Sequence, residues 1–221
     1  MGNNHTATMR IILIRHGQPD IEPARWISHR AFQHYIDRYQ DAGLAPESMP
    51  PEHLRETVAG VSRVFTSELK RAIESAERLL PGVEQVSSAV FTEAPLASPP
   101  IRGLRLKVPA WAVLARVAWH GGYTPSIENY WQAKRRALRA FRILSQAAVN
   151  EGTAVLVAHG YFNAILGRML TRRGWRRVSG AHRAVYWNTV VYELAGLSQG
   201  ATIASRSGRG RSSIGAEGLP T

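Results

Sequence analysis

Several residues that could bind or transform an anionic group stand at or just beyond the ends of apolar runs in this chain. They are Arg15, His16, Gly17, Arg71, Glu93, His159 and Gly160. One guanidinium group can bind two phosphate oxygens at once, and it keeps its charge at all ordinary pH values. A neutral imidazole has a lone pair that can attack phosphorus, and flanking cations favour that neutral form. These residue types together favour chemistry on a phosphate group.

Arg71 is informative because of its predicted place in a helix. The apolar spacing over residues 68–80 predicts a helix, and Ser67 is a suitable N-cap. A cation in the first turn is disfavoured by the helix dipole by about 0.3–1 kcal/mol, whereas an anion binds well there. We therefore expect a bound anion beside Arg71, and we expect Arg71→Ala to cost the unliganded protein no more than about 1 kcal/mol.

The predicted elements alternate between strand and helix, which is typical of an α/β fold with helices on both faces of a sheet. Strands are predicted at residues 9–14, 61–66, 87–93, 153–160 and 184–194. Helices are predicted at residues 27–41, 68–80, 109–119, 127–149 and from 160 onward. Ligands of such sheets bind beyond the carboxyl ends of the strands, so the residues above should share one edge. The fold class is a three-layer α/β/α sandwich with a mostly parallel sheet.

The chain divides into one folded domain with two ends of different composition. The domain is predicted over residues 9–195, after a flexible N-terminus at 1–8. A basic tail rich in Gly and Ser, residues 196–221, is expected to be disordered. Two proline-containing segments, about 20–58 and 94–126, are predicted to be insertions that cap the site.

The charge of the chain favours anionic partners. Its 28 Lys and Arg residues exceed its 16 Asp and Glu residues, which gives a formal charge of +12. Phosphate esters, nucleic acid and acidic membrane surfaces all fit this sign. Six arginines fall between Arg168 and Arg183. The helix from Gly160 onward carries them about 18 Å from the site, so a solvated surface is expected there and polyanion contact is the alternative.

Other features of the composition exclude several classes of protein. The longest apolar stretch, residues 108–119, contains Arg116 and is shorter than the roughly 18–20 residues that cross a membrane. The chain has no cysteine and no secretory signal pattern, so we expect a soluble cytoplasmic protein without disulfides. No spacing of ligand residues indicates a metal site, and no cofactor is expected.

Four short blocks of sequence carry a resemblance to a known family. They are "LIRHGQP" (residues 13–19), "TSELKRAIESAE" (66–77), "FTE" (91–93) and "VLVAHG" (155–160). In this order and spacing they resemble the histidine phosphatase superfamily, which has the phosphoglycerate mutase-like fold. The resemblance covers about residues 9–194.

The resemblance implies a role for each residue of the predicted site. His16 would be the nucleophile that becomes a phosphohistidine, and water would then release the phosphate without a metal ion. The phosphate group would be held by Arg15, Arg71, His159 and Gly17. Glu93 would be the general acid, with Asp20 and Glu128 as alternatives. Weaker candidates for contact with the rest of the substrate are Gln18, Arg102, Arg105 and Asn163.

Two departures from the family pattern limit the inference about the substrate. Pro19 stands where many members have threonine, and no matching asparagine follows it. Gly160 follows His159, where one branch has its catalytic aspartate. We expect a phosphoric monoester hydrolase that acts on a small anionic phosphate ester, with no nucleic-acid partner. The alternatives are a phosphoglycerate mutase-like phosphotransferase and a basic protein that binds polyanions or an acidic membrane surface.

Overall fold

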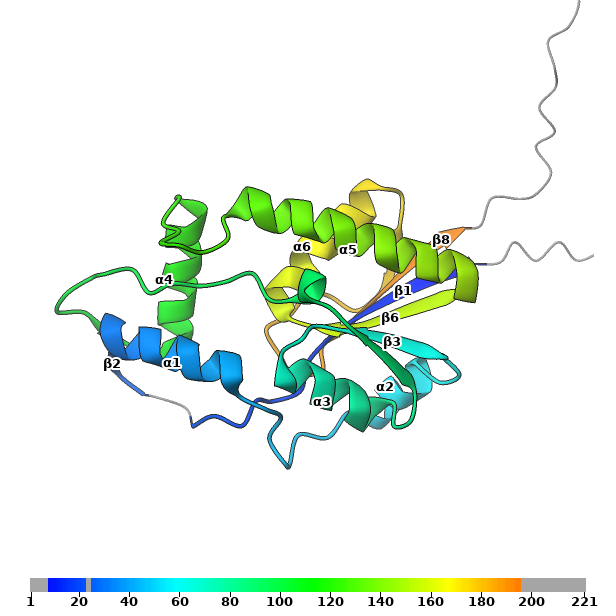
Figure 1. Ribbon diagram of the computed structural model, residues 1–221, viewed down its shortest axis with the longest axis horizontal. Helices are drawn as coiled ribbons and strands as arrows, with labels where there is room; N and C mark the ends of the chain where they lie inside the picture. The colour runs from blue at the N-terminus through cyan, green and yellow to red at the C-terminus, as the bar shows by residue number, and fades with distance from the viewer. Residues whose placement is uncertain (1–7, 23–24, 196–221) are drawn as a thin grey trace, which may run out of the picture.

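The centre of the molecule is a six-stranded sheet (Figure 1). The computed structural model describes residues 8–22 and 25–195. In spatial order the strands are β4 (Glu84–Ser87), β3 (Arg63–Thr66), β6 (Thr153–Ala158), β1 (Thr8–Arg15), β8 (Thr189–Ala195) and β7 (Arg176–Ser179). The first four run parallel, whereas β8 is antiparallel to β1 and β7 is antiparallel to β8. The predicted mostly parallel sheet is confirmed.

Helices cover both faces of the sheet (Figure 1). They are α5 (Tyr130–Glu151) and α6 (Gly160–Arg172) on one face, and α2 (Glu52–Thr57) and α3 (Lys70–Leu79) on the other. Alternate side chains of β1 enter the two layers: Ile11 and Leu13 face α5 and α6, and Ile12 and Ile14 face α3. A strand buried on both faces reads as a continuous apolar run, which is why β1 was predictable.

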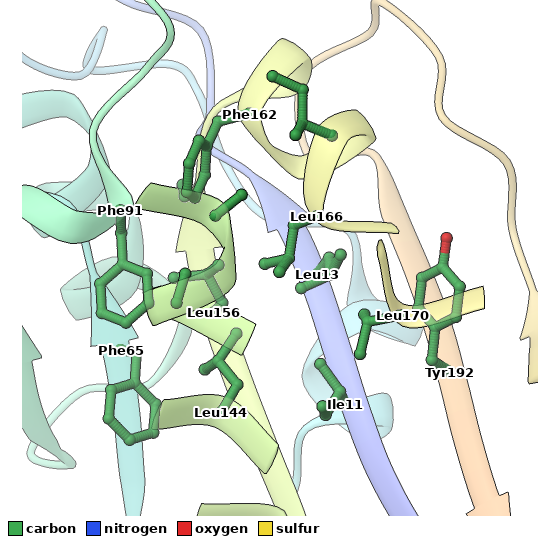
Figure 2. Close-up of a cluster of buried hydrophobic side chains, with 14 of the residues drawn as sticks. Ile11, Leu13, Phe65, Phe91, Leu144, Leu156, Phe162, Leu166, Leu170 and Tyr192 are labelled. Atoms are coloured by element: carbon green, nitrogen blue, oxygen red, sulfur yellow. The ribbon is translucent and has the colours of Figure 1, made fainter. Parts of the chain in front are cut away.

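The larger core cluster lies between the sheet and the layer of α5 and α6. Figure 2 shows Leu13 of β1 and Leu156 of β6 beneath Phe162 and Leu166 of α6. Each of these four side chains is almost completely buried. Burial of one such side chain stabilises the fold by about 1.5–3 kcal/mol. This layer therefore fixes the first turn of α6, where His159 precedes the helix, against the end of β1.

The two predicted insertions pack on one another at one end of the sheet (Figure 1). They contribute β2 (Ile27–Ser28), α1 (His29–Asp41), β5 (Arg105–Leu106) and α4 (Val108–His120). Strands β2 and β5 pair antiparallel, and the rings of Phe32 and Trp111 stack with centroids 5.8 Å apart. Trp111 donates its indole N–H to the carbonyl oxygen of Ile27 at 2.7 Å. The two segments thus form one cap lobe with its own apolar cluster.

One predicted strand is wrong, and some elements were not predicted. Residues 87–93 are not a strand: β4 ends at Ser87, and a 3-10 turn occupies Ala89–Phe91. The Ser88 hydroxyl accepts a hydrogen bond from the Val90 N–H, and such local bonds favour turns over strands. The last strand begins at Thr189 rather than at residue 184. Helix α2 falls within the predicted insertion at 20–58 but packs on the sheet through Leu54 rather than in the cap lobe. Strand β7 falls within the arginine-rich stretch.

Thr8, the last residue of the predicted flexible N-terminus, is the first residue of β1. The rest of that segment, residues 1–7, and the predicted disordered tail, residues 196–221, lie outside the described residues. Among the helices that are described, none has the length and apolar character needed to cross a membrane.

Candidate active site

Residues that follow three strands meet at one edge of the sheet, two of them predicted site residues. Strands β1, β3 and β6 are parallel neighbours, so their carboxyl ends deliver His16, Ser67 and His159 to the same edge. The amide of His16 donates to the carbonyl of Ala158 at 2.9 Å, which ties the end of β1 to the end of β6. Strand β8 runs the other way and brings Tyr186, which precedes it, to this edge.

His16 is buried and its ring is held in one orientation. Its side chain is 2% exposed, and Nδ1 lies 2.6 Å from the carbonyl oxygen of Gly17. A carbonyl can only accept a hydrogen bond, so in the neutral ring Nδ1 carries the proton and Nε2 carries the lone pair. The Arg71 Nε donates toward this Nε2 across 3.4 Å. The contacts therefore present a nucleophilic nitrogen to a guanidinium group.

Gly17, whose carbonyl oxygen orients the His16 ring, is closely packed. A Cβ atom at this position would lie 2.5 Å from the Ser48 hydroxyl oxygen and 2.6 Å from the Trp187 ring, distances that side chains do not adopt. The Gly17 amide donates to the Ser75 hydroxyl oxygen at 2.9 Å. The structure thus gives Gly17 a packing role, and its contact with phosphate stays a prediction.

His159 faces His16 across the site. The centroids of the two rings are 5.1 Å apart, and His159 is fully buried. Its Nε2 lies 2.6 Å from the Ser67 hydroxyl, and Nδ1 has no hydrogen-bond partner in the described part of the chain. The prediction of Ser67 as the N-cap is wrong, because α3 begins at Lys70 with Leu69 as its N-cap and no side-chain cap hydrogen bond. Ser67 instead orients His159. Gly160 leaves room for Arg15, because a Cβ there would lie 3.3 Å from the Arg15 Cδ.

Two arginines and two tyrosines surround the histidines. Arg71 is 1% exposed and donates from Nη1 to the carbonyl oxygens of Tyr39 at 2.6 Å and Gln40 at 3.2 Å. Its guanidinium carbon lies 4.6 Å from the centroid of the Tyr39 ring, and that of Arg15 lies 4.7 Å from the Tyr186 ring. Neither arginine forms an ion pair within residues 8–22 and 25–195. Neutral carbonyls and ring faces therefore make the direct contacts to these two positive charges, while burial lowers the pKa of Arg71 and the charge of Glu93 raises it.

The two tyrosines were not predicted as site residues. Tyr39 falls in the predicted helix at residues 27–41, where its aromatic neighbours indicated only a partly buried face. Tyr186 is 40% exposed, and no local pattern distinguishes it. Burial, with a smaller contribution from Tyr186, raises the pKa of Tyr39 to about 12, against the opposing effect of the arginines.

The electrostatics of the site keep both histidines neutral. Burial lowers the pKa of His16 well below its usual value of 6.5, and the charges of Arg71 and Arg15 lower it further. The hydrogen bond to Gly17 opposes this shift. Burial also lowers the pKa of His159 well below 6.5, with added effects from His16 and both arginines. A neutral His16 has the free lone pair that a nucleophile requires.

Glu93 lies at the N-terminus of α6, directly beyond His159. Its carboxylate accepts hydrogen bonds from the backbone N–H groups of Tyr161 at 3.2 Å and Phe162 at 2.8 Å. These N–H groups are unsatisfied within the helix, and the helix dipole favours a negative charge there. The sequence did not predict that Glu93 would cap α6. The segment before Glu93 was predicted as a strand, but it contains a 3-10 turn.

Arg116 of the cap lobe joins α4 to the segment that follows Glu93. Its guanidinium donates to the carbonyl oxygens of Ala94 at 3.0 Å and Pro95 at 3.2 Å, and lies 3.9 Å from the Tyr161 ring centroid. Burial lowers the pKa of Arg116, and the charge of Glu93 raises it. A cation of the cap thus stands close to the candidate acid.

The two alternative acids have different surroundings. Arg136 of α5 donates to both carboxylate oxygens of Glu128, at 2.6 and 2.9 Å. Glu128 therefore holds the segment before α5 against that helix. Asp20 is exposed in the segment before the cap lobe. No cluster of three or more His, Asp or Glu side chains suited to a metal ion occurs in the part of the chain that is described.

The weaker candidates for substrate contact are not gathered at the histidines. Gln18 is exposed, and its backbone N–H donates to the Ser48 hydroxyl oxygen at 2.7 Å. Asn163 is buried and donates to the carbonyl oxygen of Ile14 at 3.0 Å. Arg102 and Arg105 are exposed in the cap lobe, where Arg105 donates to the carbonyl oxygen of Trp26 at 3.0 Å. Neither cap arginine contacts His16 or His159 through a hydrogen bond in the described ranges.

The contacts of Arg71 change the expected effect of its removal on stability. Arg71→Ala leaves two carbonyl oxygens at the end of α1 without their charged donor, which outweighs the relief of the helix dipole. We expect the free energy of unfolding to fall by about 2–4 kcal/mol in phosphate-free urea titrations. Arg55→Ala is a matched control, since Arg55 makes one 3.5 Å contact with a carbonyl and one exposed ion pair. Equal losses in both variants would contradict this account.

Comparisons with known proteins identify the family of the chain. A family model described as the histidine phosphatase superfamily (branch 1) matches residues 11–204. The comparison with curated proteins found no match. Among solved structures, the product of the open reading frame Rv3214 of Mycobacterium tuberculosis has 13% identity and a TM-score of 0.53. That alignment covers 86% of this chain and 98% of the other.

Two further solved structures are similar. The Thermus thermophilus protein TTHB049 has 19% identity and a TM-score of 0.51, over 83% of this chain and 92% of its own. The mycobacterial glucosyl-3-phosphoglycerate phosphatase Rv2419c has 20% identity and a TM-score of 0.47, over 75% of this chain and 80% of its own. The first of these shares the fold, and the family model spans most of the chain. The chain therefore belongs to the histidine phosphatase superfamily.

Proposed function

We propose that this protein hydrolyses small phosphate monoesters through a phosphohistidine at His16. One observation carries the proposal: Nδ1 of His16 is fixed on the Gly17 carbonyl, so a neutral Nε2 faces Arg71. A nucleophile at this nitrogen needs no separate base to remove a proton. Its flanking cations favour the neutral ring and can also bind the phosphoryl oxygens.

In the first step, the Nε2 lone pair of His16 forms a bond to phosphorus, and the bond from phosphorus to the ester oxygen breaks. Glu93, in the role of general acid, gives a proton to the leaving oxygen. In the second step, water attacks the phosphohistidine and gives a proton to Glu93. The nitrogen–phosphorus bond breaks, inorganic phosphate leaves, and His16 is again neutral. Glu93 recovers in this step the proton that it gave in the first, so the cycle closes without a cofactor.

The charges around His16 support this route. Transfer of a phosphoryl group spreads negative charge over its oxygens, and positioned cations stabilise that charge. Arg15 and Arg71 have no carboxylate partner in the described part of the protein. The buried Nε of Arg15 and Nδ1 of His159 also have no hydrogen-bond partner there. Phosphoryl oxygens would supply acceptors for these groups, which are otherwise costly to bury.

The cap lobe supports a small substrate. Its α1 reaches the site, because Arg71 binds the carbonyl oxygens of Tyr39 and Gln40 and lies on the Tyr39 ring. Its α4 reaches the segment that follows Glu93 through the hydrogen bond from Arg116 to the carbonyl oxygen of Ala94. The leaving group would therefore lie beneath the cap lobe.

The phosphohistidine can be trapped directly. Protein quenched during turnover of a radiolabelled ester should carry phosphate that is lost in acid and kept in base, as expected for a phosphorus–nitrogen bond. Peptide mapping should place it on His16. Release of inorganic phosphate without an added bisphosphorylated cofactor should accompany it, which distinguishes hydrolysis from mutase-like transfer. Labelling at another residue, or acid-stable labelling, would reject the assignment.

The buried histidines should also make folding stability depend on pH. Above pH 6.5 a histidine is neutral in both the folded and the unfolded chain and contributes no dependence. As the pH falls below 6.5, the unfolded chain binds protons that the buried ring of His16 refuses, so stability is lost. His159 acts in the same sense, as does His182, whose pKa burial lowers to about 4.

Urea titrations at pH 6.5 and pH 5 test this linkage. Relative to the wild type, His16→Gln should lose about 1–2 kcal/mol less stability between these values, because one refused proton is removed. The exposed His34 is a matched control, and His34→Gln should keep the wild-type dependence. Identical curves for all three proteins would show that the folded chain protonates His16 as readily as the unfolded chain does, and would contradict this account.

A further inference from the structure

A strip of cations follows α5, and one end of it lines a hollow together with α6; neither His16 nor His159 lines this region. Two adjoining hollows of about 840 and 410 Å³ lie along this strip and share Arg135 and Leu138 in their walls. Helix α5 contributes Lys134, Arg135, Arg139 and Arg142 to them. Helix α6 and its end contribute Arg168, Arg172 and Arg173. We name these seven side chains and the two hollows the basic groove.

The basic groove has almost no compensating acid. Of the described residues that line its hollows, Glu128 alone is acidic, and both of its oxygens bind Arg136. None of the seven cations forms an ion pair with a described residue. Solvated helix faces ordinarily alternate the two signs of charge, since opposite charges at i and i+4 attract. The groove is therefore a field of one sign rather than a mixed polar surface.

The spacing of these arginines opposes helix stability. Arg135 and Arg139 are four positions apart, Arg139 and Arg142 three, and Arg168 and Arg172 four. Like charges at these spacings repel and destabilise a helix by a few tenths of a kcal/mol per pair. The dipole at the end of α6 accounts for Arg172, but Arg135 and Arg139 lie in the interior of α5. An anion bound in the groove would remove this repulsion.

Aromatic rings lie among the cations. The Trp131 side chain is 66% exposed, and the Lys134 ammonium lies 4.7 Å from its ring centroid and 5.5 Å from that of Tyr130. Trp131 stands four positions before Arg135, so the exposed ring continues the arginine stripe. Cationic grooves with exposed rings are the arrangement that binds single-stranded nucleic acid, because cations follow the phosphates and rings stack on the bases.

We propose that the basic groove binds single-stranded nucleic acid without reading its sequence. An acidic membrane fits less well, because a helix that binds the interface lays an apolar face into it. The apolar face of α5 is already buried in the core through Ala133, Ala137 and Leu144. The proposal departs from the expectation of no nucleic-acid partner and, for Arg168, Arg172 and Arg173, from that of a merely solvated surface. It does not depend on the hydrolase activity.

Fluorescence anisotropy with the full-length protein tests the proposal. The probes are labelled 12-nucleotide oligo-dT and oligo-U without terminal phosphates, so that the candidate active site has no monoester to hold. We expect binding at about 150 mM salt that weakens steeply as salt rises, with a slope of about −0.7 per phosphate contacted. Absence of binding at this salt would overturn the proposal, as would preferential binding to vesicles containing phosphatidylserine.

Variants separate the basic groove from the overall charge of the chain. Arg135→Glu should weaken binding about tenfold or more and reduce the salt slope. Arg30→Glu is the matched control: it makes the same charge change at an exposed site on α1 and should alter affinity by about twofold or less. Trp131→Ala should weaken binding about 5- to 150-fold, and Trp131→Phe should restore most of it. Equal effects of Arg135→Glu and Arg30→Glu, with circular dichroism showing both folded, would refute the groove.

Discussion

His16→Ala is expected to lower kcat/KM for phosphate monoesters by about 10⁴-fold or more and to abolish the trapped phosphoprotein. The substitution removes the nitrogen that attacks phosphorus, and no other described nitrogen occupies that position between Arg71 and His159. Residual turnover would come from the side chains of Arg15 and Arg71, because they still stabilise the charge that develops on the phosphoryl oxygens.

The measurement needs a control for folding, because His16 is buried and bonded to the Gly17 carbonyl. Circular dichroism and binding of inorganic phosphate should show whether the variant keeps its fold and its arginine cluster. His34→Ala removes an exposed histidine of the cap lobe and should retain full activity. Substantial turnover by a folded His16→Ala protein would reject the nucleophile assignment.

Glu93→Gln is expected to have the second large effect, and its size should depend on the leaving group. Glutamine has nearly the same shape but has no proton to give, so hydrolysis of alkyl phosphates should slow by about 10²- to 10⁴-fold. Nitrophenolate leaves without help, so p-nitrophenyl phosphate should lose much less. A rapid burst of nitrophenolate followed by slow turnover would show that the second step also needs Glu93.

The hydrogen bonds of Glu93 set the control for this experiment. The glutamine carbonyl can still accept one N–H from α6, so stability should fall by only about 1 kcal/mol. Glu128→Gln is the matched variant, because it weakens the Arg136 pair and leaves the candidate acid in place. It should slow both kinds of ester equally. Equal slowing of the burst for both esters in Glu93→Gln would instead direct attention to Asp20.

The predicted parts of the fold are those whose signal is local. The runs that became β1 and β6 are buried on both faces, and continuous apolar sequence is the direct result. The spacing of apolar residues in α3 and α6 likewise marks the face that packs on the sheet. Parallel strands bring their carboxyl ends to one edge, so the sequence alone predicted that His16 and His159 lie together.

Elements with weak local signals were missed for the complementary reason. Strand β4 has the sequence EQVS, and its residues are exposed or only partly buried, so no apolar run marks it. Strands β2 and β5 have two residues each and exist through pairing between distant segments. Strand β7 is formed by exposed residues of an arginine-rich stretch, so no apolar pattern predicted its pairing with β8.

Sequence alone was sufficient for the fold class, the family and the residue types that meet at one edge, because each depends on local patterns or short motifs. The working geometry depends on partners far apart in the chain. Ser67 and His159, which share a hydrogen bond, are 92 positions apart, and Glu93 caps an N–H 68 positions away. Tyr39 and Tyr186 meet the arginines in the same way. The basic groove likewise exists only because α5 and α6 pack side by side, which turns two separate arginine stripes into one surface.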